Sequence, residues 1–242
     1  EKNLPLHSHL LLNNIKVYRG SENDVLDRFL ACANEYKGDI IVRITGDCPF
    51  IDPKIVDRTI DYHFNQKADY TSNHYPPTFP DGFDVEVFPV QTLQKAHNAA
   101  TDWRDREHVT LFVKNHSDFK LATYKNDMDL SHYRLTLDNP EDYNVISQIF
   151  TSSRDPLVES LDGILSIIHS DSALLARVSG HKYNEGLTLN SGQKLWRRAN
   201  NCIPGGNHLL SKKPEMFLPK LWPAYFSKAK GAHVWDLDNQ KY

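Results

Sequence analysis

Two aspartates stand where an α/β protein could bind a divalent cation. Asp47 follows the apolar, β-branched run at residues 39–44, and Asp138 follows a similar run at residues 133–137. Carboxylates at the carboxyl ends of strands can converge on one ion, and Mg²⁺ prefers one or two carboxylates together with phosphate oxygens. The alternative interpretation is that each aspartate only caps the helix that follows it.

A second group of acids surrounds a glycine in residues 79–86. Gly82 allows a turn with positive φ, and Asp81, Asp84 and Glu86 flank it before an alternating strand. Carboxylates accept paired hydrogen bonds from neighbouring hydroxyls, so this pattern indicates recognition of a sugar. The alternative is a charged edge at the entry of a hairpin.

A third group combines Arg106, Glu107 and His108. The arginine could meet a phosphate or a sugar carboxylate, while Glu107 and His108 could orient a substrate. The same residues also fit a solvated helix face with local charge pairs. The remaining histidines lack the paired spacing of a zinc site on one helix.

Strands and helices alternate along the first three quarters of the chain. Strands are expected at residues 15–19, 39–44, 69–73, 84–88, 119–124 and 132–137. Helices are expected between them, at residues 25–36, 53–66, 90–100 and 104–116, and again after residue 139. This order predicts an α/β fold with a doubly wound, mostly parallel sheet.

The sequence changes character after about residue 190. A helix is expected at residues 193–200 and a β-hairpin arm over residues 225–237, with a polar loop between them. We therefore expect two domains, residues 1–190 and residues 191–242.

Composition narrows the classes of function. The net charge is −3 over 242 residues with no basic stripe, so a nucleic acid is not an expected partner. No apolar run reaches the roughly 20 residues of a membrane span, and no signal peptide is visible. The three scattered cysteines indicate reduced thiols in a cytoplasmic protein.

Six segments in order resemble the cytidylyltransferase family of spore-coat polysaccharide biosynthesis proteins, which is related to the acylneuraminate and Kdo cytidylyltransferases. They are residues 20–28, 42–52, 69–73, 80–88, 106–110 and 137–142. The resemblance implies a nucleotide-diphospho-sugar transferase-like fold. It also implies transfer of CMP from CTP to an acidic or amino sugar, with release of pyrophosphate.

The same resemblance assigns roles to the three groups. Asp47 and Asp138 match the two Mg²⁺-binding aspartates, and Arg106 joins them as a catalytic residue. The segment with Asp81, Asp84 and Glu86 faces the sugar, and Glu107 and His108 lie near it. Family members open with a strand and a Gly-, Arg- and Lys-containing nucleotide loop, so the stretch beginning at Glu1 is not expected to catalyse alone.

Residues 195–206 and 226–238 resemble the amino-terminal segment of class III aminotransferases, in the glutamate-1-semialdehyde aminomutase-like subgroup. There the segment is a helix and β-arm at the interface of a homodimer. The cofactor would be pyridoxal phosphate, whose lysine lies downstream of the residues compared.

Three hypotheses remain for the function of the whole protein. The first is a sugar cytidylyltransferase fused to an aminotransferase. The second is an aminotransferase or aminomutase with a non-catalytic sugar- or nucleotide-binding module upstream. The third is a glycosyltransferase that uses a nucleotide-sugar donor, although Cys48 and Pro49 stand where such enzymes usually have an Asp-x-Asp pair.

Overall fold

The computed structural model describes residues 3–153, 159–179, 191–203 and 225–241. The chain divides into two compact units, residues 1–180 and residues 181–242. The division lies before residue 190, the expected domain boundary.

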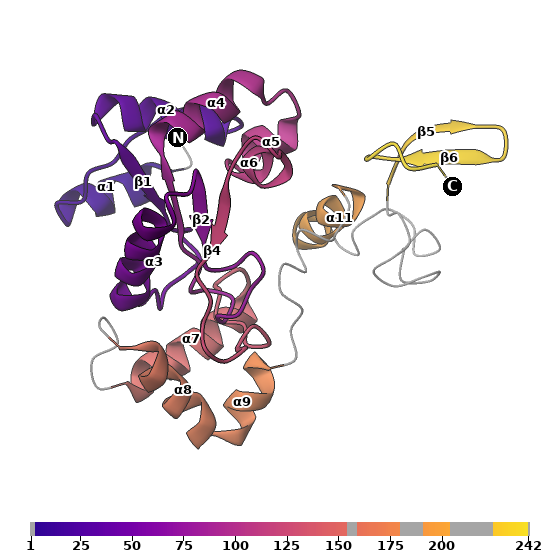
Figure 1. Ribbon diagram of the computed structural model, residues 1–242. Coiled ribbons are helices and arrows are strands. Elements are labelled where there is room, and N and C mark those ends of the chain that lie inside the picture. The colour runs from indigo at the N-terminus through magenta and orange to yellow at the C-terminus, as the bar shows by residue number, and fades with distance from the viewer. Residues whose placement is uncertain (1–2, 154–158, 180–190, 204–224, 242) are drawn as a thin grey trace. The chain divides into compact units, whose positions relative to one another are not determined.

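The first unit is built on a mixed sheet with the strand order β1-β3-β2-β4 (Figure 1). The strands are β1 (Ile40–Arg43), β2 (Tyr70–Ser72), β3 (Glu86–Pro89) and β4 (Leu121–Thr123). β3 runs antiparallel to both of its neighbours, and only β2 and β4 pair in parallel. The prediction of a mostly parallel sheet was therefore wrong. Parallel neighbours in a sheet are usually joined through a crossover helix, and the connection from β2 to β3 contains no helix.

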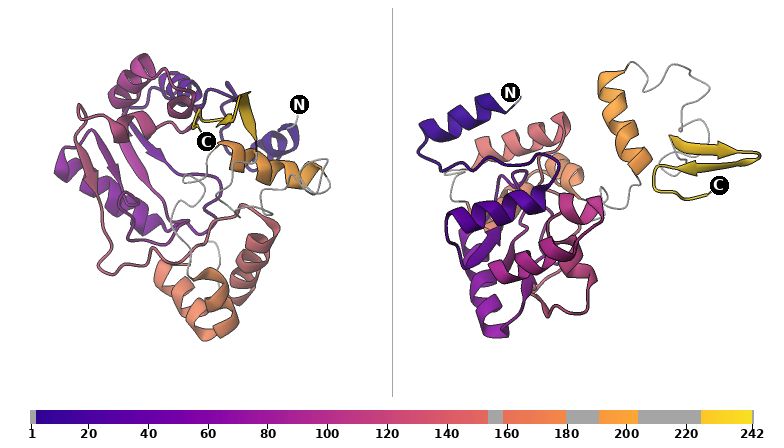
Figure 2. Two further views of the ribbon diagram at one scale, coloured as in Figure 1. Left: turned by 90° about the vertical axis from the view of Figure 1, so that its right-hand side faces the viewer. Right: turned by 90° about the horizontal axis from the view of Figure 1, so that it is seen from above.

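Helices cover both faces of this sheet, as Figures 1 and 2 show. Their bounds are α1 Leu4–Leu12, α2 Val25–Glu35, α3 Pro53–Gln66, α4 Val90–Ala99, α5 Trp103–Glu107, α6 Leu111–Asn115, α7 Pro140–Ser152, α8 Leu161–Ser170 and α9 Ser172–Val178. Because side chains alternate along a strand, Val87 of β3 enters one core and Phe88 enters the other. The first core lies with α3, α7, α8 and α9, and the second lies with α2, α4 and α6.

Helix starts follow local sequence signals. The carboxylate of Asp24 accepts a hydrogen bond from Asp27 N and begins α2, and Asp52 accepts one from Lys54 N and begins α3. Asn139 and Asp142 form a reciprocal capping box at the start of α7. The helices predicted after residues 24, 52 and 139 are confirmed.

Three predicted elements differ. Residues 15–19 form no strand, since neither sheet of the described chain offers them a hydrogen-bonding partner. The helix predicted at 104–116 is broken into α5 and α6 by Val109, whose φ of 60° is left-handed. Residues 132–137 make isolated bridges, Asp81 to Arg134 and Tyr133 to Ser179, instead of a continuous strand.

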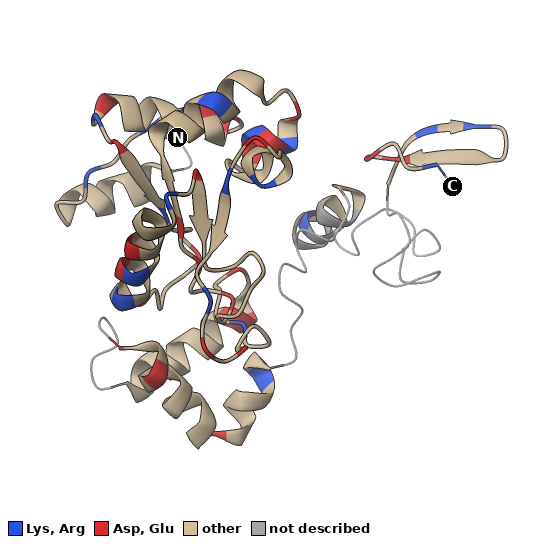
Figure 3. Cartoon of the chain, in the orientation of Figure 1, with Lys and Arg blue, Asp and Glu red and all other residues tan. Residues whose placement is uncertain are grey.

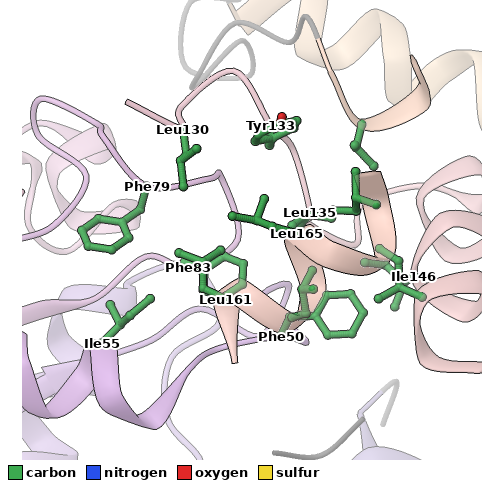
Figure 4. Packing of buried hydrophobic residues seen from close by; sticks show 14 of the residues in the cluster. Phe50, Ile55, Phe79, Phe83, Leu130, Tyr133, Leu135, Ile146, Leu161 and Leu165 are labelled. Atoms are coloured by element: carbon green, nitrogen blue, oxygen red, sulfur yellow. The ribbon is translucent and has the colours of Figure 1, made fainter. Parts of the chain in front are cut away.

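The first core includes hydrophobic side chains from the segments that carry the candidate acids, and Figure 4 shows how these side chains pack together. Phe50, Phe83, Leu135 and Ile146 all belong to it. Phe50 is three positions after Asp47, Phe83 lies between Asp81 and Asp84, and Leu135 is three positions before Asp138. Ile146 comes from α7, the helix that follows Asp138. Burial of these side chains therefore fixes the backbone from which the acids project.

The second unit contains α11 (Ser191–Cys202) and the antiparallel hairpin β5 (Phe226–Lys230) and β6 (His233–Asp236). The helix and the β-arm predicted here are confirmed. Asp238 accepts a hydrogen bond from Ser191 N at 2.6 Å and so joins the arm to the start of α11. Among the described residues of both units, no helix has the length and apolarity needed to cross a membrane.

Candidate active site

The segments of the two predicted metal-binding aspartates lie side by side. Leu137 N donates a hydrogen bond to the backbone oxygen of Asp47 at 2.9 Å. Asp138 is the next residue after Leu137, so one backbone hydrogen bond brings together the segments of two aspartates that are 91 positions apart in the sequence. The two segments are therefore adjacent at the backbone, and the convergence of the two carboxylates on one ion stays a prediction.

Neither aspartate caps a helix. Asp52 caps α3 and Asn139 caps α7, so the alternative interpretation of Asp47 and Asp138 as N-caps is wrong. Asp47 is partly buried, and its Oδ1 lies 3.8 Å from the thiol of Cys48. The two carboxylates are thus left for a role other than helix capping.

Asp138 is held by its own segment. Its Oδ2 accepts hydrogen bonds from Arg134 Nη2 at 2.7 Å and from Thr136 Oγ1 at 3.1 Å. The guanidinium of Arg134 also binds both carboxylate oxygens of Asp142, at 2.9 and 3.0 Å. Burial lowers the pKa of Arg134, but the two carboxylates more than offset this and leave the pKa above its ordinary value. Figure 3 shows acidic and basic positions close together in the loops between the sheet and α7.

The acidic segment at residues 79–86 flanks the same strip of chain. Asp81 N donates to Tyr133 O at 3.0 Å, and Leu135 N donates to Asp81 O at 2.7 Å. Gly82, with a φ of 108°, packs against the backbone of Leu135. Residues 133–137 therefore lie between the Asp81 segment and the Asp47 segment.

Asp84 and Asp47 both lie near the thiol of Cys48. Burial first, and then the charges of Asp84 and Asp47, raise the pKa of the Cys48 thiol to about 12. Asn73 holds the backbone on both sides of Asp84, because its side chain donates to Phe83 O and accepts from Val85 N. Three segments joined by backbone hydrogen bonds thus carry four aspartates, which are Asp47, Asp81, Asp84 and Asp138.

Glu86 lies inside the protein, which differs from the expectation that it faces a sugar. Its side chain is 1 % exposed and forms an ion pair with Arg43, its cross-strand neighbour on β1. It also accepts hydrogen bonds from Tyr70 at 2.5 Å and Thr110 at 2.7 Å, and Lys114 lies 3.0 Å away. These partners come from two strands and from the α5–α6 segment.

The charges around Glu86 determine its ionisation and that of His74. Burial would raise the pKa of Glu86, but Lys114 and Arg43 hold it well below its ordinary value. Burial lowers the pKa of His74 to about 4. The charge of Glu86 acts to raise this pKa, whereas the charges of Lys114 and Arg43 lower it further. At neutral pH the cluster therefore contains a carboxylate, two cations and a neutral imidazole.

The contacts of Arg106 are with α2 and α4. Arg106 Nε donates to Asp24 at 2.6 Å, and its Nη1 donates to the carbonyl of His97 at 3.1 Å. The arginine therefore ties α5 to α2 and α4, which differs from the expected catalytic position. Glu107 is exposed and His108 is partly buried at the end of α5.

Sequence reasoning missed the cations that hold these acids. Arg43, Lys114 and Arg134 each contact a carboxylate of the site. A signal was present for Arg134, which precedes Asp138 by four residues in the run at residues 133–137, and for Arg43, which lies in the segment at residues 42–52. None was present for Lys114, since its pairing with Glu86 depends on how α6 packs against β3.

The donors present fit Mg²⁺. In the described residues, no group of three or more His, Cys, Asp or Glu side chains is arranged to hold a metal ion. A cation at Asp47 and Asp138 would therefore take its other ligands from water and phosphate oxygens, as Mg²⁺ commonly does. Every contact of the Asp138 carboxylate with described residues goes through Oδ2, which leaves Oδ1 for such an ion.

Comparison with known proteins gives one consistent result. The sequence profile of the family described as "Cytidylyltransferase" matches residues 11–163. "Spore coat polysaccharide biosynthesis protein SpsF" of Bacillus subtilis is 32% identical over 168 residues, which cover 68% of this chain and 69% of that protein. "Uncharacterized protein MJ1063" of Methanocaldococcus jannaschii is 36% identical over 138 residues, 56% of each chain.

A solved structure agrees with the sequence relatives. The structure of a cytidylyltransferase from Leptospira borgpetersenii serovar Hardjo-bovis superposes with a TM-score of 0.66 at 31% identity, covering 76% of each chain. The matched range 11–163 also contains every residue of the three groups described above. The chain therefore belongs to the cytidylyltransferase family and is a nucleotidyltransferase by descent.

Proposed function

We propose that this protein transfers CMP from CTP to an acidic or amino sugar used in surface polysaccharide, with Mg²⁺ held by Asp47 and Asp138. The observation that carries the proposal is the hydrogen bond from Leu137 N to Asp47 O, which joins the two aspartate segments. Family membership supports the nucleotide, and the name of the Bacillus subtilis relative supports the polysaccharide.

In the proposed reaction a sugar hydroxyl oxygen attacks the α-phosphorus of CTP. The new bond joins the sugar oxygen to the α-phosphorus. The bond between the α-phosphorus and the oxygen that bridges to the β-phosphate breaks, and pyrophosphate leaves with the electron pair of that bond. Bound Mg²⁺ would supply charge neutralisation and alignment of the phosphate oxygens. The hydroxyl proton passes to solvent water as the new ester bond forms.

The chain's own residues position the reactants. Asp81 and Asp84 lie on the segment beside the aspartate pair and accept hydrogen bonds from sugar hydroxyls in this proposal. Glu86 is assigned to the framework, because its carboxylate is occupied by protein cations and hydroxyls. A catalytic role for Arg106, and roles for Glu107 and His108 in substrate binding, remain predictions from the resemblance.

The proposed setting is the cytoplasm and the proposed assembly is a homodimer. Cys32, Cys48 and Cys202 are free thiols, which agrees with a reducing compartment. Both statements remain predictions.

The experiment measures pyrophosphate release by the full-length protein from CTP, Mg²⁺ and a panel of acidic and amino sugars. Asp47→Asn and Asp138→Asn should each reduce turnover by about 100-fold or more, since each removes a charge that stabilises the transition state. Asp61→Asn, on the exposed side of α3, is the matched control and should keep wild-type turnover.

The nucleotide is tested in the same assay by replacing CTP with UTP or ATP. Turnover with CTP alone supports the proposal. Undiminished turnover in both Asp47→Asn and Asp138→Asn would remove the metal assignment, and preference for another nucleotide would remove CTP.

We extend the proposal to residues 191–242 as the amino-terminal segment of an aminotransferase-like domain. The supporting observation is the order of α11 and the β5–β6 hairpin, which is the helix and arm that the resemblance implies. No described residue of this unit is assigned to hold pyridoxal phosphate, so no step is derived from that cofactor. A full-length protein without the visible absorbance of bound pyridoxal phosphate would contradict this part.

A further inference from the structure

The backbone at Arg134 is held in place by a hydrogen bond and by a buried neighbour. Its backbone nitrogen donates to Val178 O at 2.9 Å, and the next residue, Leu135, is 1 % exposed in the first core. The side chain itself is 21 % exposed. The side chain of Arg134 therefore extends from a restrained backbone, which limits how far the guanidinium can move away from its partners.

The guanidinium joins two carboxylates at once. Nη1 and Nη2 bind the two oxygens of Asp142 side by side, and Nη2 also donates to Oδ2 of Asp138 at 2.7 Å. Such paired contacts between arginine and carboxylate add geometric precision as well as energy. The orientation of the Asp138 carboxylate is therefore set by Arg134.

Asp142 holds the backbone of the Asp138 segment. Its Oδ2 accepts hydrogen bonds from Asp138 N at 2.9 Å and from Asn139 N at 3.1 Å. Asp138 is thus held by its backbone through Asp142 and by its side chain through Arg134. Thr136 Oγ1 adds a second donor to the same oxygen, Oδ2, at 3.1 Å.

We propose that Arg134 determines the metal preference of the site by occupying Oδ2 of Asp138, so that this carboxylate offers a single oxygen and favours Mg²⁺ over Ca²⁺. This inference rests on the proposed function, in which Asp138 is a metal ligand. Arg134 is a positioning residue in it, since it acts only through Asp138.

The physical basis is the difference between the two cations. Ca²⁺ takes six to eight oxygens and accepts both oxygens of one carboxylate, whereas Mg²⁺ requires a compact octahedron of single oxygens and water. A carboxylate whose second oxygen is held by an arginine and a threonine cannot bind in the two-oxygen mode without breaking both contacts. That requirement disfavours Ca²⁺ more than Mg²⁺.

The test measures cation binding directly, without turnover. The full-length protein is titrated with Mn²⁺, free Mn²⁺ is followed by electron paramagnetic resonance, and Mg²⁺ and Ca²⁺ are used as competitors. Wild-type protein should favour Mg²⁺. Arg134→Gln should shift the ratio of the two competition constants towards Ca²⁺ by about tenfold, the lower end of effects seen for residues that orient metal ligands.

Two further variants separate orientation of Asp138 from folding. Thr136→Val keeps the shape of a buried side chain but removes the other donor to Oδ2, and should shift the ratio in the same direction. Arg134→Lys can still donate to Oδ2 and should return the ratio towards the wild-type value. Arg104→Gln is the matched control, since Arg104 also contacts both oxygens of an aspartate, Asp102, but on exposed α5.

The outcomes distinguish this proposal from the one beneath it. If Asp138→Asn and Asp47→Asn bind Mn²⁺ as tightly as the wild type, the metal assignment fails, and the role of Arg134 fails with it. If those variants lose Mn²⁺ but Arg134→Gln and Thr136→Val keep the wild-type ratio of Mg²⁺ to Ca²⁺, only the role of Arg134 is overturned. Should Arg134→Gln not fold, Thr136→Val decides alone.

Discussion

Arg43 and Glu86 face each other across the β1–β3 pair, and their side chains form an ion pair in which Glu86 is 1 % exposed. Lys114 approaches the same carboxylate from α6 at 3.0 Å. Two cations thus surround one buried anion on an inner strand of the sheet. One of the cations, Arg43, lies four residues before Asp47 on the same chain segment. Loss of that anion should be felt both in stability and in the geometry of the site.

Glu86→Gln is expected to destabilise the first unit by about 3–5 kcal/mol, the usual effect of removing one partner from a buried ion pair. The glutamine keeps the shape but leaves Arg43 and Lys114 without a counter-charge. Chemical denaturation followed by circular dichroism measures the change. Glu35→Gln, exposed at the end of α2, is the control and should stay within about 0.5 kcal/mol of wild type. Equal stability of the two variants would contradict the role of Glu86.

His74 should make stability fall as the pH is lowered. Its folded pKa is about 4, against an ordinary value of 6.5, so between these values the unfolded chain binds a proton that the folded chain does not. The stabilisation is complete above pH 6.5 and is lost as the pH falls to about 4. The shift corresponds to about 3 kcal/mol.

The measurement is the unfolding free energy in urea across that pH range, for wild type and His74→Gln. The glutamine cannot take up the proton, so the variant should show a flatter profile. A smaller slope should remain, because burial also lowers the pKa of His63. His9→Gln, exposed on α1, should reproduce the wild-type slope. A wild-type slope in His74→Gln would show that the imidazole does not carry the effect.

Cys48 should resist alkylation in the folded protein. Burial, followed by the charges of Asp84 and Asp47, raises the pKa of its thiol to about 12, so little thiolate is present at pH 8. Cys202 is exposed and should react first with N-ethylmaleimide. Mass spectrometry of peptides sampled over time measures the order in which the two cysteines are alkylated. Rapid labelling of Cys48 in a protein that remains folded would contradict the packing of the Asp47 segment.

The sequence predicted the elements whose signals are local. Pro53 at the start of α3 and the apolar run of β1 gave the correct positions of both elements. The direction of β3 was missed because it depends on the connection from β2, which contains turns but no helix. Strand direction is a property of the connection and cannot be read from the alternation of β3 itself.

The candidate site shows the same division. Asp47 and Asp138 could be singled out by type and position, but only the structure shows that Asp52 and Asn139 take the capping roles. Glu86 could not be separated from Asp84 by sequence, because both alternate along one segment. Its burial follows from the packing of Lys114 and Thr110 over it, which is a long-range contact.

Gly82→Ala tests whether the strip at residues 133–137 must lie against the acidic segment. A Cβ at Gly82 would come within 2.8 Å of the carbonyl carbon and oxygen of Leu135, and the φ of 108° is unfavourable for alanine. The variant should lose about 3 kcal/mol or more of stability. It should also lose pyrophosphate release, because Asp138 moves with the displaced strip.

The matched control is Gly46→Ala, beside the other aspartate. A Cβ at Gly46 meets no atom within 4 Å, and its φ is not in the left-handed region. Stability should therefore stay unchanged or rise by up to about 1 kcal/mol, because alanine restricts the unfolded chain. Thermal and urea unfolding of the two variants give the comparison. If Gly82→Ala matched Gly46→Ala in stability, the close approach of Gly82 to Leu135 could not be what holds the Asp138 segment in place.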